Sequence, residues 1–530
     1  MASGSSKLTV RHAIEGGWAT DFGPVAEVGL TPGGVALIPY MLDAQNILLS
    51  LDGGQRKIGG TSKLNASAVG GGLPVRGLYD FWRQNSLGAL QKRVVHAGTI
   101  CAVDNADGSF SNIFTGLTQD AVPSYNTFDD KLIISSTKDA PRSYDGTTGQ
   151  LLAGSPPNFA WTVTHKGRVF GGGDPANPST LSYCVEFDPE DWVGSGSGSI
   201  QINPGDGDEL TGAVSHKNEL FLFKGPYRGS IHRLVGSSPT GDDAFALRPY
   251  IDGLGAIWHN SIFRFRDDIG FIWMDGSVHS LNATASYGDF YESSLSRPLN
   301  AYLRAHTRPY KLKNAWAAPD ISASRVYLSV TIDAALNNNL TVVMDFRFDP
   351  PRWTYINAWG ATALASVHDT SSRDLPVIMI GTSDGYVKKT DVATQSIDGV
   401  TAIDANVVLP YLNYGLPHKL KTIQSAGIGL TPGGNYTATF GWRRDNQTRQ
   451  EQDVTQGGGD VLGPSATHPF TLDTSALSGG YYTDRWLDLP TGGEFRAVQY
   501  DFSQDGVNEN LELHGFTVTM EVGSDSLENT

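Results

Sequence analysis

An Asp-Gly pair recurs along this chain between short runs of apolar and alternating residues. The segment FIWMDGSVHSL (271–281) shows the pattern, with an apolar run before the pair and alternation after it. Asp-Gly tolerates the positive φ angles of a two-residue hairpin turn, and such flanks are typical of β-strands. The repetition therefore predicts hairpin turns at Asp107, Gly108, Asp145, Gly146, Asp275, Gly276, Asp384 and Gly385.

The spacing of these turns indicates how the strands are grouped. The intervals are uneven, on the order of 30–60 residues, in the range of four-stranded propeller blades. Short sheets that pack face to face around a common centre leave only short, protected edges. Residues 75–400 are therefore predicted to form a β-propeller of six or seven blades. Two β-sandwiches in tandem are the alternative, because the same alternation could supply them.

The pattern changes after about residue 400. Segments such as HKLKTIQSAGIGL (418–430) and LELHGFTVTMEVG (511–523) are longer and alternate regularly. This pattern is typical of a sandwich whose sheets each have one solvated face. We therefore predict an all-β chain with three parts: an extended N-terminal arm and first strands at 1–74, the propeller at 75–400, and a β-sandwich at 401–530.

The composition limits the functions that this chain can perform. With 55 Asp and Glu against 39 Lys and Arg, the net charge is −16, whereas a protein that grips nucleic acid needs a basic surface. Cys101 and Cys184 have no CxxC partner and are expected to be buried thiols in a reducing compartment. The N-terminus lacks the apolar core of a signal peptide, and no apolar run approaches the ~18 residues of a membrane span. We expect synthesis in the cytoplasm and no membrane-spanning segment.

The search for chemical motifs finds little. The sequence contains no HExxH motif and no Walker-type loop, and GSGSGS (194–199) has the wrong phase for a nucleophile elbow. NPGDGDEL (203–210) gathers oxygen ligands of the kind that calcium prefers, but not at EF-hand spacing. Whether Ca²⁺ binds there stays open at this point. We expect no catalytic residues, no cofactor, no metal site and no enzymatic activity.

Basic residues gather in two short segments, at 304–316 and 441–449. Isolated basic strands often protect a sheet edge, but such clusters could also contact phosphates or an acidic partner surface. The candidate contact residues are Arg304, Arg308, Lys311, Lys313, Arg443 and Arg444.

Three parts of the chain resemble the tail-hub or nozzle proteins of short-tailed bacteriophages, a group that includes packaged-DNA stabilisation proteins. The arm EGGWATDFGP (15–24) and the Arg-Lys-x-Gly-Gly step within 46–65 are similar to the family's opening. The segments 213–236 and 251–281 resemble its blades, in which an apolar strand, a Gly-rich linker and an apolar strand ending in Asp-Gly follow one another. YLNYGLPHKLKTIQSAGI (411–428) resembles the module that follows the propeller.

This resemblance implies a structural virion protein. Copies of it would form a ring, commonly a hexamer, in a tail tube that lines and closes the genome-exit channel. The implied partners are copies of itself, the portal adaptor, other tail proteins and, transiently, the translocating genomic DNA. The implied location is the virion tail, after assembly in the host cytoplasm, and the family brings no catalytic residues. A net charge of −16 would suit a lumen along which DNA slides without sticking.

The alternative function is a glycan-binding or glycan-cleaving β-propeller of a virion or cell surface. Trp192 and Trp258 are the candidate sugar platforms, because an exposed aromatic ring offers an apolar face. The turn FDPEDW (187–192) offers carboxylates for cleavage, although a glycosidase needs two that face each other across a cleft.

Overall fold

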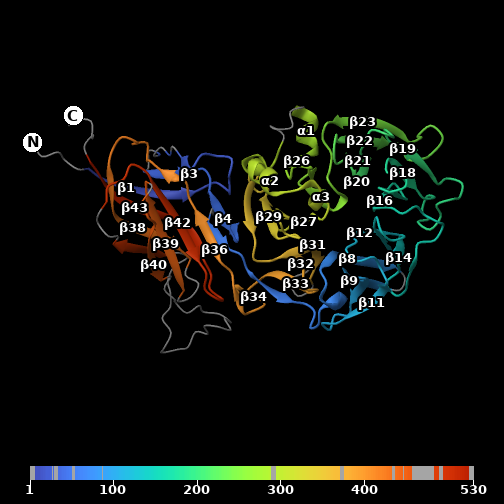
Figure 1. The fold of residues 1–530 in the computed structure, drawn as a ribbon, viewed down its shortest axis with the longest axis horizontal. Helices are drawn as coiled ribbons and strands as arrows, with labels where there is room; N and C mark the ends of the chain where they lie inside the picture. The colour runs from blue at the N-terminus through green and yellow to red at the C-terminus, as the bar shows by residue number, and fades with distance from the viewer. Residues whose placement is uncertain are drawn as a thin grey trace, which may run out of the picture. The chain divides into compact units, whose positions relative to one another are not determined.

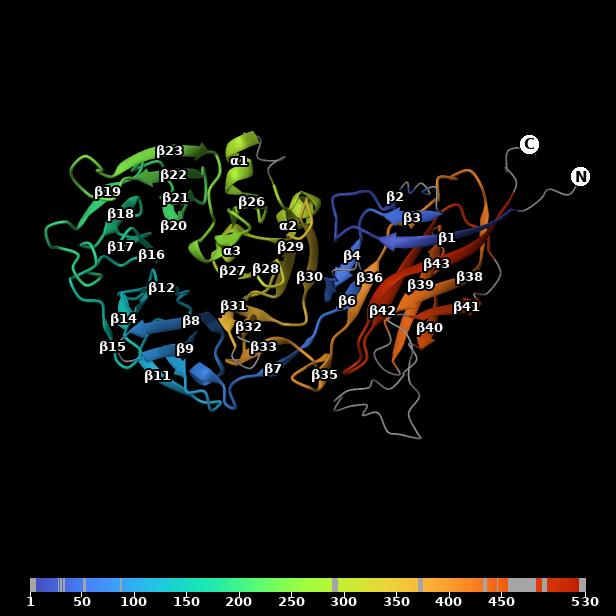
Figure 2. The same cartoon turned by 180° about the vertical axis from the view of Figure 1, so that it is seen from behind.

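The structure is a computed structural model of an all-β chain with many small sheets (Figures 1 and 2). It describes residues 6–26, 28, 31, 34–50, 54–85, 88–287, 294–369, 375–431, 436–445, 447–455, 483–488 and 493–523. The chain divides into two compact units. The terminal unit comprises residues 1–62, 352–358 and 391–530, and the central unit comprises residues 63–351 and 359–390.

The terminal unit contains two larger sheets. Across the first, the strands run β3 (Val35–Ile38), β1 (Ser6–Ile14), β43 (Glu512–Val522), β38 (Lys421–Leu430) and β41 (Thr483–Asp488), with β6 (Gln55–Lys57) between β43 and β5 (Ile47–Leu49). Across the second, they run β2 (Val25–Ala26), β37 (Tyr411–Leu412), β42 (Val498–Gln504), β36 (Ala405–Val408), β4 (Asp43–Gln45) and β30 (Arg352–Ile356). In addition, β39 (Thr437–Arg444) pairs with β42 and with β40 (Gln450–Thr455). The short strand β34 (Ser396–Ile397) pairs with β35 (Thr401–Ala402) and with β7 (Gly60–Lys63). The N-terminal strands thus share sheets with strands from beyond residue 400.

Aromatic side chains join these two sheets. The ring of Phe516 in β43 lies 5.0 Å from that of Tyr500 and 5.2 Å from that of Phe502, both in β42. Phe440 in β39 lies 6.2 Å from Phe516. Because alternate residues of a strand point to opposite faces, each strand directs one set of aromatic residues into this shared core.

The central unit consists of small antiparallel sheets built from consecutive strands. The first sheet contains β8 (Val75–Asn85), β9 (Gly88–Ala97), β10 (Ile100–Asp104) and β11 (Phe110–Thr115). The second contains β12 (Ser124–Phe128), β13 (Lys131–Ser135), β14 (Arg142–Tyr144) and β15 (Gly149–Leu151). The third contains β16 (Trp161–His165), β17 (Arg168–Gly172), β18 (Thr180–Tyr183) and β19 (Gly198–Gln201). The next is β20 (Glu209–His216), β21 (Glu219–Gly225), β22 (Ser230–Val235) and β23 (Ala246–Asp252). Then come β24 (Phe263–Phe265), β25 (Asp268–Ile272) and β26 (Val278–Ser280); β27 (Trp316–Asp320), β28 (Arg325–Val330) and β29 (Leu340–Asp345); and β31 (Ala361–His368), β32 (Pro376–Thr382) and β33 (Val387–Val392).

The first strands of these sheets contact one another in a closed order, as the two views show (Figures 1 and 2). β8 contacts β12, β12 contacts β16, and β16 contacts β20. The 3₁₀ helix η2 (His259–Ser261) contacts both β20 and β27, β27 contacts β31, and β31 contacts β8 again. The sheets therefore follow one another around a common centre, to which six contribute their first strand and the fifth contributes the η2 segment that precedes β24.

Short helices join some of these sheets. α1 (Leu281–Tyr287), η3 (Arg297–Leu299), α2 (Asn300–His306) and α3 (Pro309–Leu312) lie between β26 and β27, and η1 (Val69–Gly72) precedes β8. The apolar core is divided among neighbouring sheets: Phe81, Cys101 and Leu132 pack in one cluster, and Phe223, Phe271 and Trp273 in another. Burial of each large apolar side chain contributes about 1.5–3 kcal/mol relative to exposure.

The four Asp-Gly pairs each lie in a connection between two antiparallel strands of one sheet. The glycines have φ angles of 84° at Gly108, 94° at Gly146, 83° at Gly276 and 80° at Gly385. Three of the aspartates, Asp107, Asp145 and Asp275, accept a hydrogen bond from the backbone N–H two residues later, at 2.8–3.0 Å. Asp384 instead accepts from the Thr382 hydroxyl. A short carboxylate that caps its own turn, followed by a residue free to adopt positive φ, explains the local geometry.

Candidate functional site

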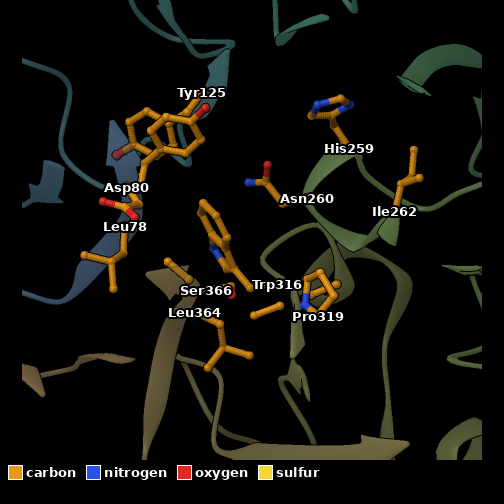
Figure 3. A pocket seen from close by; sticks show the side chains of 14 residues that line it. Leu78, Asp80, Tyr125, His259, Asn260, Ile262, Trp316, Pro319, Leu364 and Ser366 are labelled. Atoms are coloured by element: carbon orange, nitrogen blue, oxygen red, sulfur yellow. The ribbon is translucent and has the colours of Figure 1, made fainter. Parts of the chain in front are cut away.

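The first strands of the central unit enclose a hollow of about 310 Å³, which we call the central hollow (Figure 3). Its volume is near the lower end of the roughly 300–1,000 Å³ typical of small-molecule sites. Strands β8, β12, β27 and β31 and the η2 segment supply its walls. The lining residues are Leu78, Tyr79, Asp80, Tyr125, His259, Asn260, Ile262, Trp316 to Pro319, and Leu364 to Ser366.

Two stacked tyrosines line the central hollow, and Figure 3 labels one of them, Tyr125. The rings of Tyr79 and Tyr125 lie 5.2 Å apart at an interplanar angle of 19°. The Tyr79 hydroxyl lies 3.0 Å from Thr127 Oγ1, whereas the buried Tyr125 hydroxyl has no hydrogen-bond partner among the described residues. Burial raises the pKa of both phenols. Both side chains are therefore neutral at physiological pH.

His259 and Asn260 come from the η2 segment. The His259 ring stacks on Trp161 at 5.5 Å, and its Nδ1 accepts from the Ala213 N–H at 3.4 Å. Burial lowers the pKa of His259 to about 4, so its imidazole is uncharged at neutral pH. Asn260 donates from Nδ2 to the carbonyl oxygen of Pro123 at 3.0 Å, which fixes its amide.

Asp80 is the one carboxylate among the described residues that line the central hollow. Its Oδ2 accepts from Trp82 Nε1 at 2.8 Å and from the His368 N–H at 2.9 Å, and its Oδ1 accepts from Gln91 Nε2 at 2.8 Å. Hydrolysis of a glycoside needs a second carboxyl group across the cleft. The described walls of the hollow can therefore hold a small neutral molecule, but they do not supply an acid–base pair.

A second hollow of about 780 Å³ lies elsewhere on the central unit, and we call it the tyrosine groove. It brings together parts of two segments that the sequence analysis treated separately, the acidic loop 203–210 and the basic segment 304–316. Its lining residues are Pro178, Ser179, Gly205, Gly207, Asp208, Glu209, Pro226, Tyr227, Pro309, Tyr310 and Lys313.

The acidic side chains of 203–210 are already engaged within the protein. Asp206 forms an ion pair with Lys224 at 2.7 Å, and Glu209 forms one with Lys313. Asp208 accepts hydrogen bonds of 2.7–3.0 Å from the backbone N–H groups of residues 227–229. Within the described ranges, no group of three or more His, Cys, Asp or Glu side chains is arranged to hold a metal ion.

The other basic candidates of 304–316 also have acceptors nearby. Arg304 is paired with Asp275 at 3.0 Å, although its side chain is largely exposed. Arg308 donates to the carbonyl oxygens of residues 305 and 307, and Lys311 donates to those of residues 333 and 335. The contacts of Arg304 and Lys311 tie the short helices to loops between strands, whereas those of Arg308 stay within the helical segment.

Arg443 and Arg444 lie at the end of β39 in the terminal unit and differ in exposure. Arg443 is exposed. Arg444 is buried, and its guanidinium donates to the Gly493 carbonyl at 3.0 Å and to Gln450 Oε1. Neighbouring residues of a strand point to opposite faces, so this pair presents one arginine to solvent.

The expectation that Trp192 and Trp258 are exposed platforms was wrong. Their exposed fractions are 8% and 6%, and Trp192 Nε1 donates to the Pro189 carbonyl at 2.9 Å. Other aromatic side chains are exposed instead, among them Tyr227, at 75%, and Tyr310, at 71%. Both follow a proline directly, and they lie outside the strands, Tyr227 in the turn after β21 and Tyr310 in the first turn of α3. That signal was available in the sequence and was missed.

A second missed match is GTSDG (381–385), which satisfies Gly-x-Ser-x-Gly. In a nucleophile elbow, the serine lies between a strand and a helix. Here the segment is the turn between the antiparallel strands β32 and β33. The match is therefore explained by hairpin geometry.

Among the described residues, no helix combines the length and apolar character needed to span a bilayer. Both cysteines are buried free thiols, and Cys101 packs in the core between the first two sheets. Burial raises the pKa of the Cys101 thiol to about 12, which makes it a poor nucleophile.

The sequence matches no family model and no curated protein. Among solved structures, a computationally designed protein, Ika8, aligns at TM-score 0.34 and 14% identity over 62% of this chain and 100% of its own. YCF48 bound to D1 peptide aligns at TM-score 0.35 and 9% identity over 63% and 98%. An exo-beta-1,3-galactanase from Phanerochaete chrysosporium, with galactose, aligns at TM-score 0.25 and 10% identity over 93% and 99%. Such neighbours are β-propeller-like, in keeping with the many small sheets, and at these scores they carry no argument about function.

Proposed function

We propose that this chain is a non-catalytic structural protein of a bacteriophage tail. In this role, copies of the chain form a ring, with a hexamer as the expected assembly, that lines and closes the genome-exit channel. Its partners are neighbouring copies, the portal adaptor, other tail proteins and, transiently, the DNA, and its location is the virion tail.

We also propose the finer description of the fold. The central unit is a β-propeller of seven blades, one for each sheet from β8–β11 to β31–β33. The two sheets of the terminal unit form a β-sandwich around the aromatic core of Phe440, Tyr500 and Phe516. Such units resist deformation because each propeller sheet is braced by neighbours on both faces, and each sandwich sheet by its partner on one face.

The observation that carries the functional proposal is the resemblance of residues 213–236 and 251–281 to the blades of tail-hub proteins. In the structure, these segments supply β20–β22 and β24–β26, which belong to two successive sheets. Phe221 and Phe223 of the first pack with Ile269 and Phe271 of the second. The two segments that carry the resemblance thus belong to two neighbouring sheets that pack against each other.

Two further observations support a passive role. The central hollow has one carboxylate among its described lining residues, and that group is held by three hydrogen bonds. The net charge of −16 opposes tight binding of a polyanion and so favours sliding contact with DNA.

Negative-stain electron microscopy and mass photometry of the purified full chain test this proposal. We expect ring-shaped particles with a mass near six copies, alone or after addition of the portal adaptor. Particles that remain monomeric at micromolar concentration with and without the adaptor would overturn it.

A further inference from the structure

Two exposed tyrosines line the tyrosine groove, a hollow of about 780 Å³ on the central unit. Tyr227 lies in the turn between β21 and β22, and Tyr310 lies in α3. They are 75% and 71% exposed. Exposed rings of this size leave apolar surface in water, so a ligand that covers them gains free energy.

The wall that carries Tyr227 is rigid. The buried Asp208 carboxylate accepts three successive backbone N–H groups, those of residues 227–229, and so fixes the turn. Below it, the fully buried Lys224 ammonium binds Asp206 and the carbonyl oxygens of Ile202 and Asn203 at 2.7–2.9 Å. This wall is ordered before any ligand arrives, which lowers the entropic cost of binding.

The wall that carries Tyr310 is tied to the same sheet. Lys313 forms an ion pair with Glu209 of β20, and its ammonium lies 5.3 Å from the centre of the Trp258 ring. Lys311 donates to two carbonyl oxygens of residues 333 and 335. Both tyrosines are therefore held on anchored segments on either side of the groove.

The charges in the groove compensate one another. Glu209 is matched by Lys313, and Asp208 is matched by backbone donors. The side chains of Glu209 and Lys313 are 27% and 37% exposed, so a ligand can still reach them. The groove thus offers apolar faces beside one reachable acceptor and one reachable donor, and its remaining charge, the buried Asp208 carboxylate, is held by backbone donors.

We propose that the tyrosine groove binds a neutral oligosaccharide. A sugar ring presents a C–H face to an aromatic ring, and each of its hydroxyls can donate to the Glu209 carboxylate or accept from the Lys313 ammonium. A proline-rich peptide also favours grooves lined by aromatic residues, but its prolines have no N–H to donate to Glu209. This function is independent of ring assembly and adds a recognition site to the central unit.

Isothermal titration calorimetry of the full chain with maltohexaose, cellohexaose and chitohexaose tests the proposal. We expect the wild type to bind at least one of these probes with a dissociation constant on the order of 0.1–1 mM. Tyr227→Ala and Tyr310→Ala should each weaken binding about tenfold, and the double variant should lose it. Tyr227→Phe keeps the ring face and should bind within about twofold of the wild type.

Phe187→Ala is the matched control, because Phe187 is a 72% exposed aromatic residue of the central unit that does not line the groove. It should leave binding unchanged, and thermal melts should show every variant folded. The absence of binding by the wild type to all three sugars would overturn the proposal. So would unchanged affinity in the double variant, or tyrosine-dependent binding of decaproline without any sugar binding. Ring formation measured on the same variants tests the tail role separately.

Discussion

The two units of this protein bury lysines in different ways. In the central unit, the fully buried Lys224 pairs with the Asp206 carboxylate. In the terminal unit, Lys57 and Lys421 are equally inaccessible but are held by neutral oxygens. Lys57 donates to the Gln504 side chain and to the Gly506 carbonyl, and Lys421 donates to backbone carbonyls at 2.7 and 2.9 Å.

This difference shows in the energetics of the buried charge. Burial lowers the pKa of both Lys57 and Lys421 to about 8, because dipoles replace water less completely than a carboxylate does. Removal of one partner of a buried ion pair leaves an uncompensated charge, whereas a buried lysine held by carbonyls can lose its proton instead. The Lys224 pair of the central unit is therefore sensitive to loss of one acidic side chain, and the two lysines of the terminal unit are sensitive to alkaline pH.

The largest expected effect concerns histidines and would distinguish the two units in acid. Burial lowers the pKa of His96, His165 and His279 of the central unit to about 4, and that of His12 of the terminal unit to about 3. An unfolded histidine takes up a proton near pH 6.5 but these folded ones do not, so stability falls as pH drops from 6.5 toward 4. With these three and His259, whose pKa is also about 4, the central unit should lose several kcal/mol, on the order of 1–3 per histidine.

Calorimetric melts at pH 7 and pH 4.5, with peptide-resolved hydrogen exchange corrected for intrinsic rates, measure this effect. The central unit should lose protection first. Replacing His96 with Leu should flatten its pH dependence. Earlier opening of the terminal unit would contradict the comparison.

The next effect breaks the Lys224 ion pair. Asp206→Asn leaves the ammonium with a weaker partner, and we expect a loss of about 2–3 kcal/mol in unfolding free energy. The value is below the usual range for a buried pair because two backbone carbonyls still accept from Lys224. Urea unfolding measures it, and Asp206→Asn combined with Lys224→Met should recover much of the loss. A double variant as unstable as the single one would rule out an uncompensated charge as the cause.

A third, smaller effect tests the polar network in the terminal core. His12 Nε2 lies 3.0 Å from the Tyr414 hydroxyl, which lies 3.0 Å from that of Tyr500. Tyr414→Phe removes the hydroxyl between His12 and Tyr500, so each of these buried side chains loses a hydrogen-bond partner, at a cost of about 1–2 kcal/mol in unfolding free energy. Chemical denaturation monitored by tryptophan fluorescence measures the loss. The control is Tyr310→Phe, since that hydroxyl is in an exposed residue, and it should change stability by less than about 0.5 kcal/mol.

The smallest effect sharpens the comparison of lysines. Because their pKa is about 8 when folded and 10.5 when unfolded, Lys57 and Lys421 add stability above pH 10.5 that is lost as pH falls to 8. Lys57→Met should therefore reduce the slope of stability against pH between 8 and 10, because it removes the group whose charge is disfavoured in the folded state. Parallel pH titrations of the two proteins by urea unfolding check it. An unchanged slope would show that Lys57 keeps its proton.

Local chemistry made the hairpin turns predictable. Asp275-Gly276 lies in the turn between β25 and β26 because the side chain of the first residue and the φ of the second decide the geometry, with no distant contact required. The Arg-Lys step shows the opposite case. Arg56 lies on the surface beside Asp391 at 3.1 Å, while Lys57 is fully buried. The sequence predicts the same environment for both, because they are adjacent basic residues. They differ in burial because neighbouring residues of a strand point to opposite faces.

The all-β class and the strand-rich pattern follow from properties of neighbouring residues, namely alternation, turn pairs and glycine content. The exposure of Tyr227 and the burial of Trp192 depend instead on which sheets meet. The tyrosine groove joins residues near 178, 208, 227 and 310, which come together only when the sheets close around a common centre. A binding surface of this kind cannot be predicted from neighbouring residues, because it is formed by contacts between residues that are far apart in the sequence.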